Sequence, residues 1–510
     1  MKNKSMAIFL CLFLCLIGSK IQAQISEGGI PMSFSFDKSI HEIHTLVMPS
    51  ANIDSVKQAE AKLGNTPRPF RFGYEIDVDI DLKTHGTLKH LPDGGKLWLL
   101  KIHSKGAFSI NLIYNRFILS KGSRFFVYSE DRTMVLGAFT PEVSNKSYTE
   151  FATDLVKGNT IVLEYYEPGN SDNGVINIGK VVHGYINTFS GGFGLSEPCN
   201  VDANCPLGNN WIYEKRSASL IIIGGSSCSG GLINNTAQDR RPYYLTADHC
   251  FSSISPNSWI FRFKYWRPNC GSGNPDPNVW KSITGAHVRA RHATTDFLLL
   301  ELYTTPPADY NLYYAGWDRT SNPAQNSTGI HHPQGDAMKI SYTTNPAVPA
   351  AWNTAAGLTH WRVHFNEGTA EHGSSGSPLF NQARRIVGQL HGNLGYISSL
   401  PYCSQRKIEY GRFDLSWTGG GTNSTRLSNW LHPFSTSAPN TLNGMASCPE
   451  TTISGRTINQ TEIIECDKIN ITNTTVTQNG KLTLEATNII NINSGFTVES
   501  GGMLDVRIGP

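Results

Sequence analysis

Hydrophobic and polar residues alternate with a period of two over much of residues 74–183. Turn sequences, such as PDGG at residues 92–95, separate the alternating runs. Short alternating runs bounded by Gly, Asp and Pro are typical of antiparallel strands that bury one face. The expected strands cover residues 74–80, 96–102, 108–112, 125–128, 160–165 and 175–183. We therefore predict an antiparallel sandwich, with one short helix before it at residues 55–63.

Residues 448–510 alternate in shorter and more evenly spaced runs, with Asn-Gly and Gly-Gly turns between some of them. The runs lie at residues 469–471, 482–484, 489–492, 496–498 and 503–508. This pattern predicts a small β-solenoid. Its two cysteines, Cys448 and Cys466, are expected to pair with each other. Adhesion, substrate binding, export and simple capping all remain open as roles for this module.

The N-terminus has a different pattern. Lys2 and Lys4 precede an apolar run at residues 7–18, and the sequence IQA at residues 21–23 offers a cleavage site. A basic start, a short apolar core and a small residue before the cut are the parts of a secretory signal peptide. The apolar run is too short to span a bilayer comfortably. We expect residues 1–23 to be removed and the protein to be secreted, either extracellular or held at the cell surface.

Length and composition narrow the class of protein. A chain of 510 residues should form two to four domains. The formal net charge of +3 gives no reason to expect a nucleic-acid partner or an anionic membrane. Ten cysteines are present, of which two lie in the N-terminal apolar run and eight lie beyond residue 198. An even set in an exported chain predicts disulfides, and we expect no metal and no organic cofactor.

The candidate chemistry centres on the stretch EHGSSGSPLF at residues 371–380. Gly373 and Gly376 permit a sharp turn, which exposes the hydroxyl of Ser375 as a candidate nucleophile. The backbone N–H groups of Gly373 and Ser375 would then form an oxyanion hole. A surface loop rich in Gly and Ser has the same composition, so this turn acquires meaning only with support from elsewhere in the chain.

That support lies upstream. The sequence YYLTADHC at residues 243–250 describes a strand that delivers His249 beside a cysteine. The sequence TTDFLLLEL at residues 294–302 places Asp296 at the start of an apolar strand, where a carboxylate needs a partner. Asp296 would orient the imidazole of His249, which would take the proton from Ser375. Each residue alone is more simply structural, but the three together, in this order, predict a catalytic triad.

Further motifs occur in order: PCNVDANCP, SCSGGLINNT, LTADHC, ATTDFLLLEL, NLYYAGWDR, IHHP, GSSGSP, VGQLHG, YGR and SWTGGG. Together they resemble the lysyl endopeptidase family of bacterial trypsin-like serine proteases over about half the chain. The resemblance implies a double antiparallel β-barrel with His249, Asp296 and Ser375 in the cleft between the barrels.

The resemblance also implies the disulfides Cys228–Cys250, Cys205–Cys270 and Cys199–Cys403. The first would in any case hold the strand that carries His249, and from the sequence alone other pairings of these six cysteines stay possible. Trp352 and His391 match family residues that stack beside the triad and tune His249. Core packing is an equal alternative for Trp352. His331 and His332 match a motif that we interpret as structural.

The specificity pocket departs from the family pattern. A lysine pocket needs a negative charge, and the family places an aspartate two residues before Tyr-Gly-Arg, where this chain has Ile408. Glu409 is the nearest acid, but in a strand it would point to the opposite face. Glu409 is a candidate for lysine recognition, and an ordinary surface glutamate or an apolar or mixed preference is the alternative. Residues 187–198 offer no Lys or Arg for self-cleavage after a basic residue.

Activation also departs from the trypsin pattern. Trypsin-like zymogens commonly mature when a new N-terminus pairs with an aspartate just before the nucleophile, and this chain has Ser374 there. We therefore expect activation by removal of the N-terminal segment from over the cleft. In this interpretation residues 24–195 are a β-rich propeptide. A permanent accessory domain is the alternative.

The expected organisation is all-β. It comprises a signal peptide (1–23), a sandwich-like pro-domain (24–195), a chymotrypsin-like protease domain (196–447) and a solenoid-like tail (448–510). The expected function is a secreted serine endopeptidase that works through an acyl-enzyme on protein or peptide substrates, as a monomer. Cleavage after lysine is one expected specificity, and apolar or mixed specificity is the alternative. The alternatives are a non-catalytic, protease-derived binding or adhesion protein and, less favoured, an esterase of α/β fold.

Overall fold

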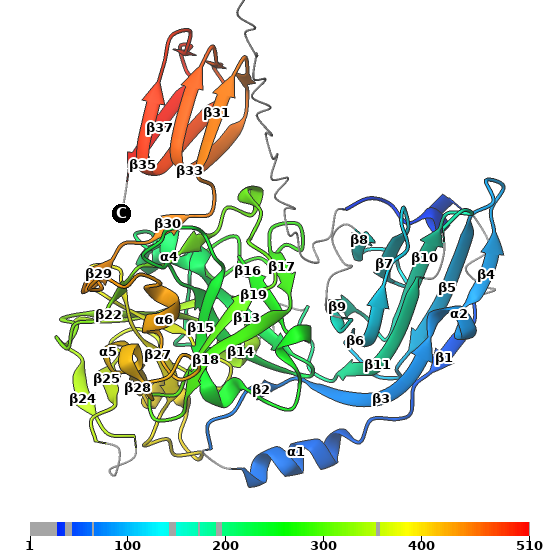
Figure 1. Cartoon of the computed structure of the whole chain (residues 1–510), viewed down its shortest axis with the longest axis horizontal. Helices are drawn as coiled ribbons and strands as arrows, with labels where there is room; N and C mark the ends of the chain where they lie inside the picture. Colours follow the sequence, from blue (N-terminus) through cyan, green and yellow to red (C-terminus); the bar gives the residue numbers. More distant parts are fainter. Residues whose placement is uncertain are drawn as a thin grey trace, which may run out of the picture.

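The computed structural model describes residues 28–35, 43–63, 66–141, 149–171, 174–189, 196–352 and 357–508, and strands dominate it (Figure 1). The predicted signal peptide, residues 1–23, lies outside the described residues. Strands gather in three regions: an N-terminal sandwich, a large central domain and a C-terminal stack. None of the helices described here is both long and apolar enough to cross a membrane.

The N-terminal region is the predicted sandwich of two sheets. One sheet has the order β1-β5-β10-β7-β8, with β4 beside β5, and the other has the order β3-β11-β6-β9. All pairings are antiparallel except β1 with β5. The bounds are β1 (Thr45–Val47), β3 (Gly73–Asp81), β4 (Thr87–His90), β5 (Lys96–His103), β6 (Ser109–Ile118), β7 (Arg124–Ser129), β8 (Val135–Phe139), β9 (Phe151–Lys157), β10 (Thr160–Glu167) and β11 (Val175–Gly184).

A shared apolar core joins these two sheets. It includes Leu100 and Leu163 from one sheet and Leu112 and Val181 from the other, all buried. Alternation therefore places one face of each strand inward, as the sequence pattern predicted. Among the residues described in this region, α1 (Ile53–Lys62) and α2 (Leu82–His85) are α-helical. α1 begins two residues before the predicted start because the side chain of Asn52 caps it by accepting from the Ser55 N–H at 3.1 Å.

The central domain contains two large, mainly antiparallel sheets. The first has the order β17-β16-β13-β14-β15-β19-β18. Its strands are β13 (Ala218–Ile223), β14 (Ser226–Leu232), β15 (Tyr243–Ala247), β16 (Ile260–Phe263), β17 (Lys281–Thr284), β18 (Ala286–His292) and β19 (Phe297–Leu302). A short N-terminal strand, β2 (Phe70–Arg71), adds to β14 and was not predicted.

The second sheet has the order β12-β23-β22-β26-β27-β28-β25-β24, with β21 and β29 at its side. Its strands are β12 (Val201–Asp202), β21 (Trp317–Asp318), β22 (Ser327–His331), β23 (Lys339–Thr343), β24 (Val348–Ala350), β25 (His360–His364), β26 (Pro378–Asn381), β27 (Ile386–Gly392), β28 (Lys407–Arg412) and β29 (Thr441–Leu442). Strands β20 (Tyr313–Tyr314) and β30 (Met445–Ala446) and helices α4 (Ile212–Ser217), α5 (Phe413–Thr418) and α6 (Ser428–Leu431) lie around them. This is the predicted all-β, chymotrypsin-like arrangement of two barrel sheets.

The C-terminal tail is a stack of parallel strands. One face has the order β31-β33-β35-β37 and the other β32-β34-β36, which is the predicted β-solenoid. The bounds are β31 (Glu450–Ser454), β32 (Thr457–Ile458), β33 (Thr461–Thr472), β34 (Thr475–Val476), β35 (Lys481–Ile492), β36 (Thr497–Val498) and β37 (Met503–Ile508). The two runs expected at 482–484 and 489–492 form one strand, β35, because no glycine or proline interrupts them and Ala486 stays buried between them.

Three disulfides lie within the central domain and a fourth lies within the tail. They are Cys199–Cys403, Cys205–Cys270 and Cys228–Cys250, which the family resemblance implied, and Cys448–Cys466, which was expected within the tail. Cys228 lies in β14 and Cys250 directly follows His249, so this bond fixes the turn after β15 to the neighbouring strand. The last bond lies within the tail.

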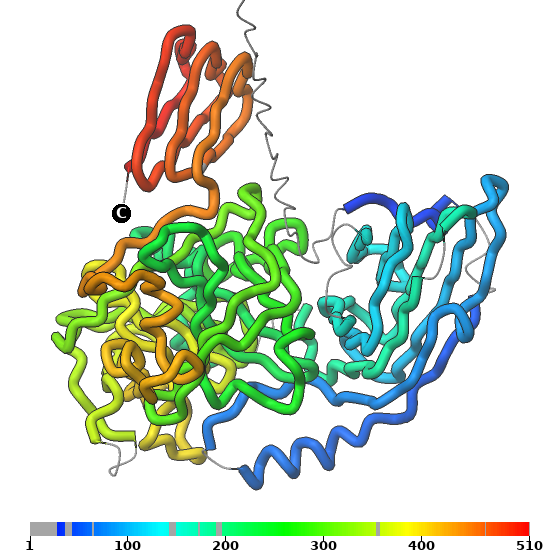
Figure 2. The backbone as a smooth tube through the Cα atoms, viewed as in Figure 1, coloured from blue at the N-terminus to red at the C-terminus, as the bar shows by residue number. Residues whose placement is uncertain are grey.

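The N-terminal sandwich packs against the first barrel sheet. Figure 2 follows the chain from α1 along the central domain and back into the sandwich. Asp154 of β9 and Arg262 of β16 form a buried ion pair across this contact. Glu75 of β3 also accepts from the Gly225 N–H at 3.1 Å. This contact thus combines polar pairs with a shared apolar cluster, which joins Leu155 of β9 to buried side chains of the first barrel sheet.

Candidate active site

His249 and Asp296 meet at the end of two paired strands. β15 ends at Ala247 and His249 follows in a single 3-10 turn, while Asp296 stands just before β19. The Nδ1 atom of His249 lies 2.8 Å from Oδ2 of Asp296, and the His249 N–H donates to Oδ1 at 2.9 Å. Asp296 therefore fixes both the ring and the backbone of His249, and the ring presents Nε2 away from the carboxylate.

Asp296 occupies an unusual position. Its φ of 55° is in the left-handed region, where a residue other than glycine persists only when its surroundings hold it. Those surroundings include Gln389, whose side chain donates to the Thr295 carbonyl at 2.6 Å, and Ser416, whose hydroxyl donates to Thr295 Oγ1 at 2.8 Å. Burial raises the pKa of Asp296, and the hydrogen bonds from His249 oppose that effect. The carboxylate therefore depends on His249 as its partner.

Ser375 sits in a tight turn that lies against β14. Gly373 and Gly376 have φ values of +90° and +82°, and a Cβ on Gly376 would meet Thr246 Oγ1 at 2.1 Å. The Ser229 N–H donates to the Ser375 carbonyl at 2.8 Å, which anchors the turn to the first barrel sheet. The turn thus requires glycine at both positions, as the sequence EHGSSGSPLF indicated.

The turn and the histidine come from opposite sheets and meet at one place. The Sγ of Cys250 lies 3.9 Å from the Ser375 carbonyl oxygen, so the residue after His249 touches the serine backbone. In the described part of the chain, Nε2 of His249 is buried and has no hydrogen-bond partner. Nucleophile–base hydrogen bonds are often long in unliganded sites and tighten with substrate. The geometry leaves Nε2 available to accept a proton.

A stack of rings lies beside this pair. Trp352 and His391 stack at 3.7 Å between ring centroids, and His391 stacks with His249 at 5.4 Å. The Nε2 of His391 is 3.7 Å from Asp296 Oδ2. Burial lowers the pKa of His391 to about 2, so its ring is neutral and acts as a wall. Sequence reasoning missed His360, whose Nε2 lies 2.9 Å from Nδ1 of His391, because its only local signal is a strand position.

His331 anchors the serine turn from behind. Its Nδ1 lies 2.7 Å from Ser374 Oγ and its Nε2 lies 3.0 Å from Ser341 Oγ. The Glu371 N–H also donates to Ser374 Oγ, at 3.2 Å. Burial lowers the pKa of His331 to about 3, so this link is made of neutral groups. In this chain the residue before the nucleophile is held by a histidine and has no ion pair.

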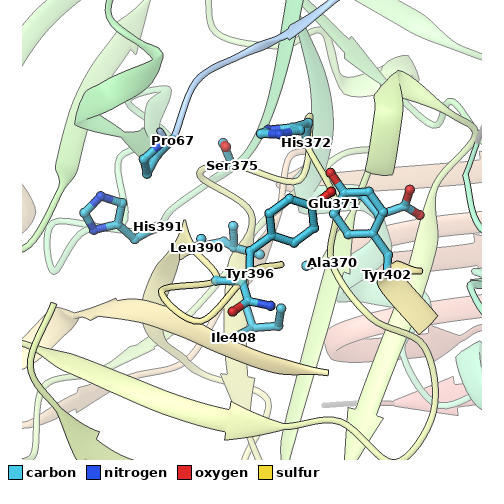
Figure 3. A pocket seen from close by; sticks show the side chains of 12 residues that line it. Pro67, Ala370, Glu371, His372, Ser375, Leu390, His391, Tyr396, Tyr402 and Ile408 are labelled. Atoms are coloured by element: carbon cyan, nitrogen blue, oxygen red, sulfur yellow. The ribbon is translucent and has the colours of Figure 1, made fainter. Parts of the chain in front are cut away.

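A pocket opens beside Ser375 (Figure 3). Its walls include Ala370, Leu390, Tyr396, Tyr402 and Ile408, and the two tyrosine rings stack at 4.9 Å. Of the two residues singled out for specificity, Ile408 lines this pocket. Glu409 points to the other face of β28, where Arg362 Nε lies 2.6 Å from Oε1 and the Leu394 N–H donates to Oε2 at 2.9 Å. The two tyrosines carried no sequence signal, because their loop has no motif.

One residue of the N-terminal segment also lines the pocket. Pro67 lies beside the same cavity as Ser375 and His391. The ring of His372 is hydrogen-bonded to the backbone of the next residue, Arg68, and β2 then pairs with β14. The segment at residues 66–71 therefore runs along the candidate active site before it enters the sandwich.

Comparisons with known proteins concern the central part of the chain. Residues 193–403 match the family model "Lysyl endopeptidase, C-terminal domain". The lysyl endopeptidase of Pseudomonas aeruginosa is 31% identical over 261 residues, which are 47% of this chain and 55% of the relative. The chain thus spans about half the length of this curated relative.

Solved structures give weaker likenesses. A Glu endopeptidase is 16% identical and has a TM-score of 0.27, over 39% of this chain and 85% of that one. The inactive form of Rv3671c from M. tuberculosis H37Rv is 12% identical with a TM-score of 0.25, over 39% and 82%. The family model and the curated relative together confirm, for the central part of this chain, the resemblance to the lysyl endopeptidase family.

Proposed function

We propose that this protein is a secreted serine endopeptidase that works through His249, Asp296 and Ser375. The observation that carries the proposal is the 2.8 Å contact of His249 with Asp296 beside a two-glycine turn that presents Ser375. His249 Nε2 takes the proton of the Ser375 hydroxyl as it attacks the peptide carbonyl, and Asp296 stabilises the imidazolium. His249 then protonates the leaving amine and later activates the water that hydrolyses the acyl-enzyme.

The oxyanion of the tetrahedral intermediate would be bound by the N–H groups of Gly373 and Ser375. Support for this role comes from the anchoring of the turn, which is held by Ser229, by Leu390 through the Gly376 N–H at 2.8 Å, and by His331. Donors fixed before the reaction need no reorganisation when charge develops, and this accounts for their catalytic value. Trp352 and His391 shield the Asp296 side of the triad from solvent.

A non-catalytic, protease-derived binding protein is the competing function. It would explain the added sandwich and solenoid, but it gives no reason for the strained φ of Asp296 or for the buried Nε2 of His249 without a partner. Strain and an unsatisfied ring nitrogen cost stability, and sites that do chemistry retain such features. We therefore favour the enzyme.

We further propose that the N-terminal sandwich is a propeptide that blocks the cleft. Pro67 lines the pocket beside Ser375, and β2 pairs with β14 directly next to the candidate active site. A substrate peptide could not enter the pocket while this segment is in place. The disulfides and the expected signal peptide support function outside the cytoplasm. The role of the solenoid stays open.

The test of catalysis uses the secreted protein, before and after limited proteolysis in the region of residues 190–195. A fluorophosphonate probe, which phosphonylates activated serines with loss of fluoride, should label the processed protein and leave the Ser375→Ala variant unlabelled. Ser398→Ala, a change at an exposed serine of a nearby loop, is the matched control and should label like the wild type. Peptide cleavage should follow the same pattern. A folded, processed protein that neither takes the label nor cleaves peptides would overturn the proposal.

The propeptide role has its own test. The central domain and tail expressed without residues 25–195 should fold and cleave peptides. A folded but inactive product would mean that the sandwich completes the active site, as an accessory domain, and does not block it.

A further inference from the structure

The pocket beside Ser375 has a defined chemistry that the proposed function does not by itself specify. It opens next to the serine and is bounded by the end of β27, by the segment before Ser375 and by the loop that carries Tyr396 and Tyr402. In the view of Figure 3, the side chain of Leu390 and the ring of Tyr396 lie between Ser375 and Ile408. Ile408 lines the same cavity as Ser375 and is almost fully buried, so a substrate side chain that fills this cavity would contact it.

The deep end of the pocket belongs to an apolar cluster. Ile408 is 1% exposed and packs with Val363, Leu390 and Tyr410. Ile408 of β28 is the cross-strand partner of Val363 of β25, so the register of these two strands fixes its position. An apolar residue at this depth offers nothing that could replace the water around an ammonium or a carboxylate.

The acid that follows in the sequence is not available to the pocket. Glu409 points to the opposite face of β28, as strand alternation requires. Its two carboxylate oxygens accept hydrogen bonds from the Arg362 side chain and from the Leu394 N–H. Arg362 and Glu409 face each other in the register of β25 and β28, so the pair is built into the sheet.

Glu371 is the one acid among the described residues that line the pocket, and its carboxylate is already hydrogen-bonded to other loops. Its carboxylate accepts from the Glu197 N–H at 2.9 Å and from the side-chain amides of Asn200 and Gln334 at 2.5 Å each. These donors come from the strand entry at residues 197–200 and from the turn after β22, outside the pocket lining. Through these hydrogen bonds the Glu371 carboxylate links its own loop to the segments that carry the donors.

The remaining polar lining is neutral. Burial lowers the pKa of His372 to about 4 and that of His391 to about 2, so both rings are uncharged near neutral pH. Two stacked tyrosines line the pocket, and aromatic faces favour apolar and flat side chains. The pocket thus combines an apolar base, aromatic walls and no available counter-ion.

We propose that the pocket accepts an uncharged, apolar side chain on the residue before the cleaved bond, and that Ile408 determines this preference. The inference rests on the proposed serine endopeptidase function and names its substrate class. It separates this protein from a lysine-cleaving enzyme, although the surrounding domain matches that family. A lysine in this pocket would lose its water without a partner, so its kcat/KM should be lower than that of leucine by about a hundredfold or more.

The experiment compares peptides that differ only in the residue before the cleaved bond: Leu, Phe, Lys or Glu. The processed full-length protein is tested beside Ile408→Asp, Ile408→Asn and Glu371→Gln, and fluorophosphonate labelling measures the fraction with an intact Ser375. We expect the wild type to prefer Leu and Phe. Ile408→Asp should gain cleavage after Lys by about tenfold or more per labelled site, whereas Ile408→Asn, of similar size and without charge, should not.

The outcomes are distinct. Wild-type cleavage that prefers Lys and is lost in Glu371→Gln would overturn the inference and make Glu371 the pocket acid. Equal cleavage of all four peptides would also overturn it, while labelling would leave the proposed endopeptidase function in place. An Ile408→Asp variant that does not label has not folded correctly, and the comparison of wild type with Glu371→Gln then decides the question. Absence of labelling in the folded, processed wild type would instead refute the proposed function itself.

Discussion

The ion pair between Asp154 and Arg262 should control how tightly the N-terminal sandwich holds the central domain. Arg262 is 1% exposed and Asp154 is 7% exposed, although they come from different parts of the chain. Arg262 Nε lies 3.1 Å from Asp154 Oδ2, and Ser282 Oγ donates to the same oxygen at 2.7 Å. The guanidinium also lies over the rings of Tyr265 and Trp280, with centroid distances of 4.9 and 4.8 Å. This is the most fully desolvated polar contact that we describe between the two parts.

The expected cost of breaking it follows from this burial. Removing one partner of a buried pair costs about 3–5 kcal/mol, because the other charge stays buried and unpaired. After the sandwich leaves, water can reach both groups, so the cost falls on the docked state. Asp154→Asn keeps one acceptor for Arg262, which favours the lower end of the range. A loss of about 3 kcal/mol corresponds to roughly a hundredfold weaker association.

The assay measures dissociation of the sandwich after cleavage of the connection. Chains that carry Ser375→Ala are nicked by an added protease near residues 190–195, and dilution is followed by sedimentation. The control is Asp77→Asn, which removes an exposed acid of the same sandwich that pairs with Lys180 at the surface. Such a pair contributes at most about 1 kcal/mol. If Asp154→Asn dissociated like Asp77→Asn and like the parent chain, the reasoning from burial would be wrong.

Three further predictions concern the site and its support. Asp296→Asn should lower kcat by about 10³- to 10⁴-fold with little change in KM, as steady-state kinetics would show, because the imidazole loses its orientation. His360→Leu should loosen His391 and change the pH profile of kcat/KM while His360→Gln retains it; identical profiles for both variants would refute this. Burial raises the pKa of the Glu214 carboxyl from 4.5 to about 7. Between these two pH values the folded state keeps a proton that the unfolded state has released. The free energy of unfolding therefore falls as the pH rises through this range. The fall is about 3 kcal/mol and should be absent in Glu214→Gln, as melts at about pH 5 and about pH 8 would reveal.

The sequence predicted the strands that bury one face and the residues that sit in strict local patterns. Alternation located six sandwich strands, and the glycines of the serine turn identified the position of Ser375, because both signals arise from backbone geometry within a few residues. Short edge strands such as β4 and β8 escaped prediction. They have too few alternating residues to stand out from turns, and they exist through pairing with a longer neighbour.

Contacts between segments that are distant in the sequence could not be predicted from it. His360 contacts His391, Gln389 supports Thr295, and Pro67 enters the pocket, and each contact joins residues that no local pattern connects. Sequence alternation did indicate that Glu409 would point away from a residue at position 408. It could not show that Arg362 stands across the sheet to receive the carboxylate, since that depends on the register of β25 with β28.

The way the serine turn is held bears on how the protein would be controlled. In the trypsin pattern a new N-terminus pairs with an acid just before the nucleophile when the zymogen matures. Here Ser374 is held by His331 and by the Glu371 N–H while the N-terminal sandwich is still attached. His249 and Asp296 are also in contact in this state. If the sandwich is a propeptide, its effect must therefore come from Pro67 and β2 covering the cleft, and a small probe should reach Ser375 more readily than a peptide does.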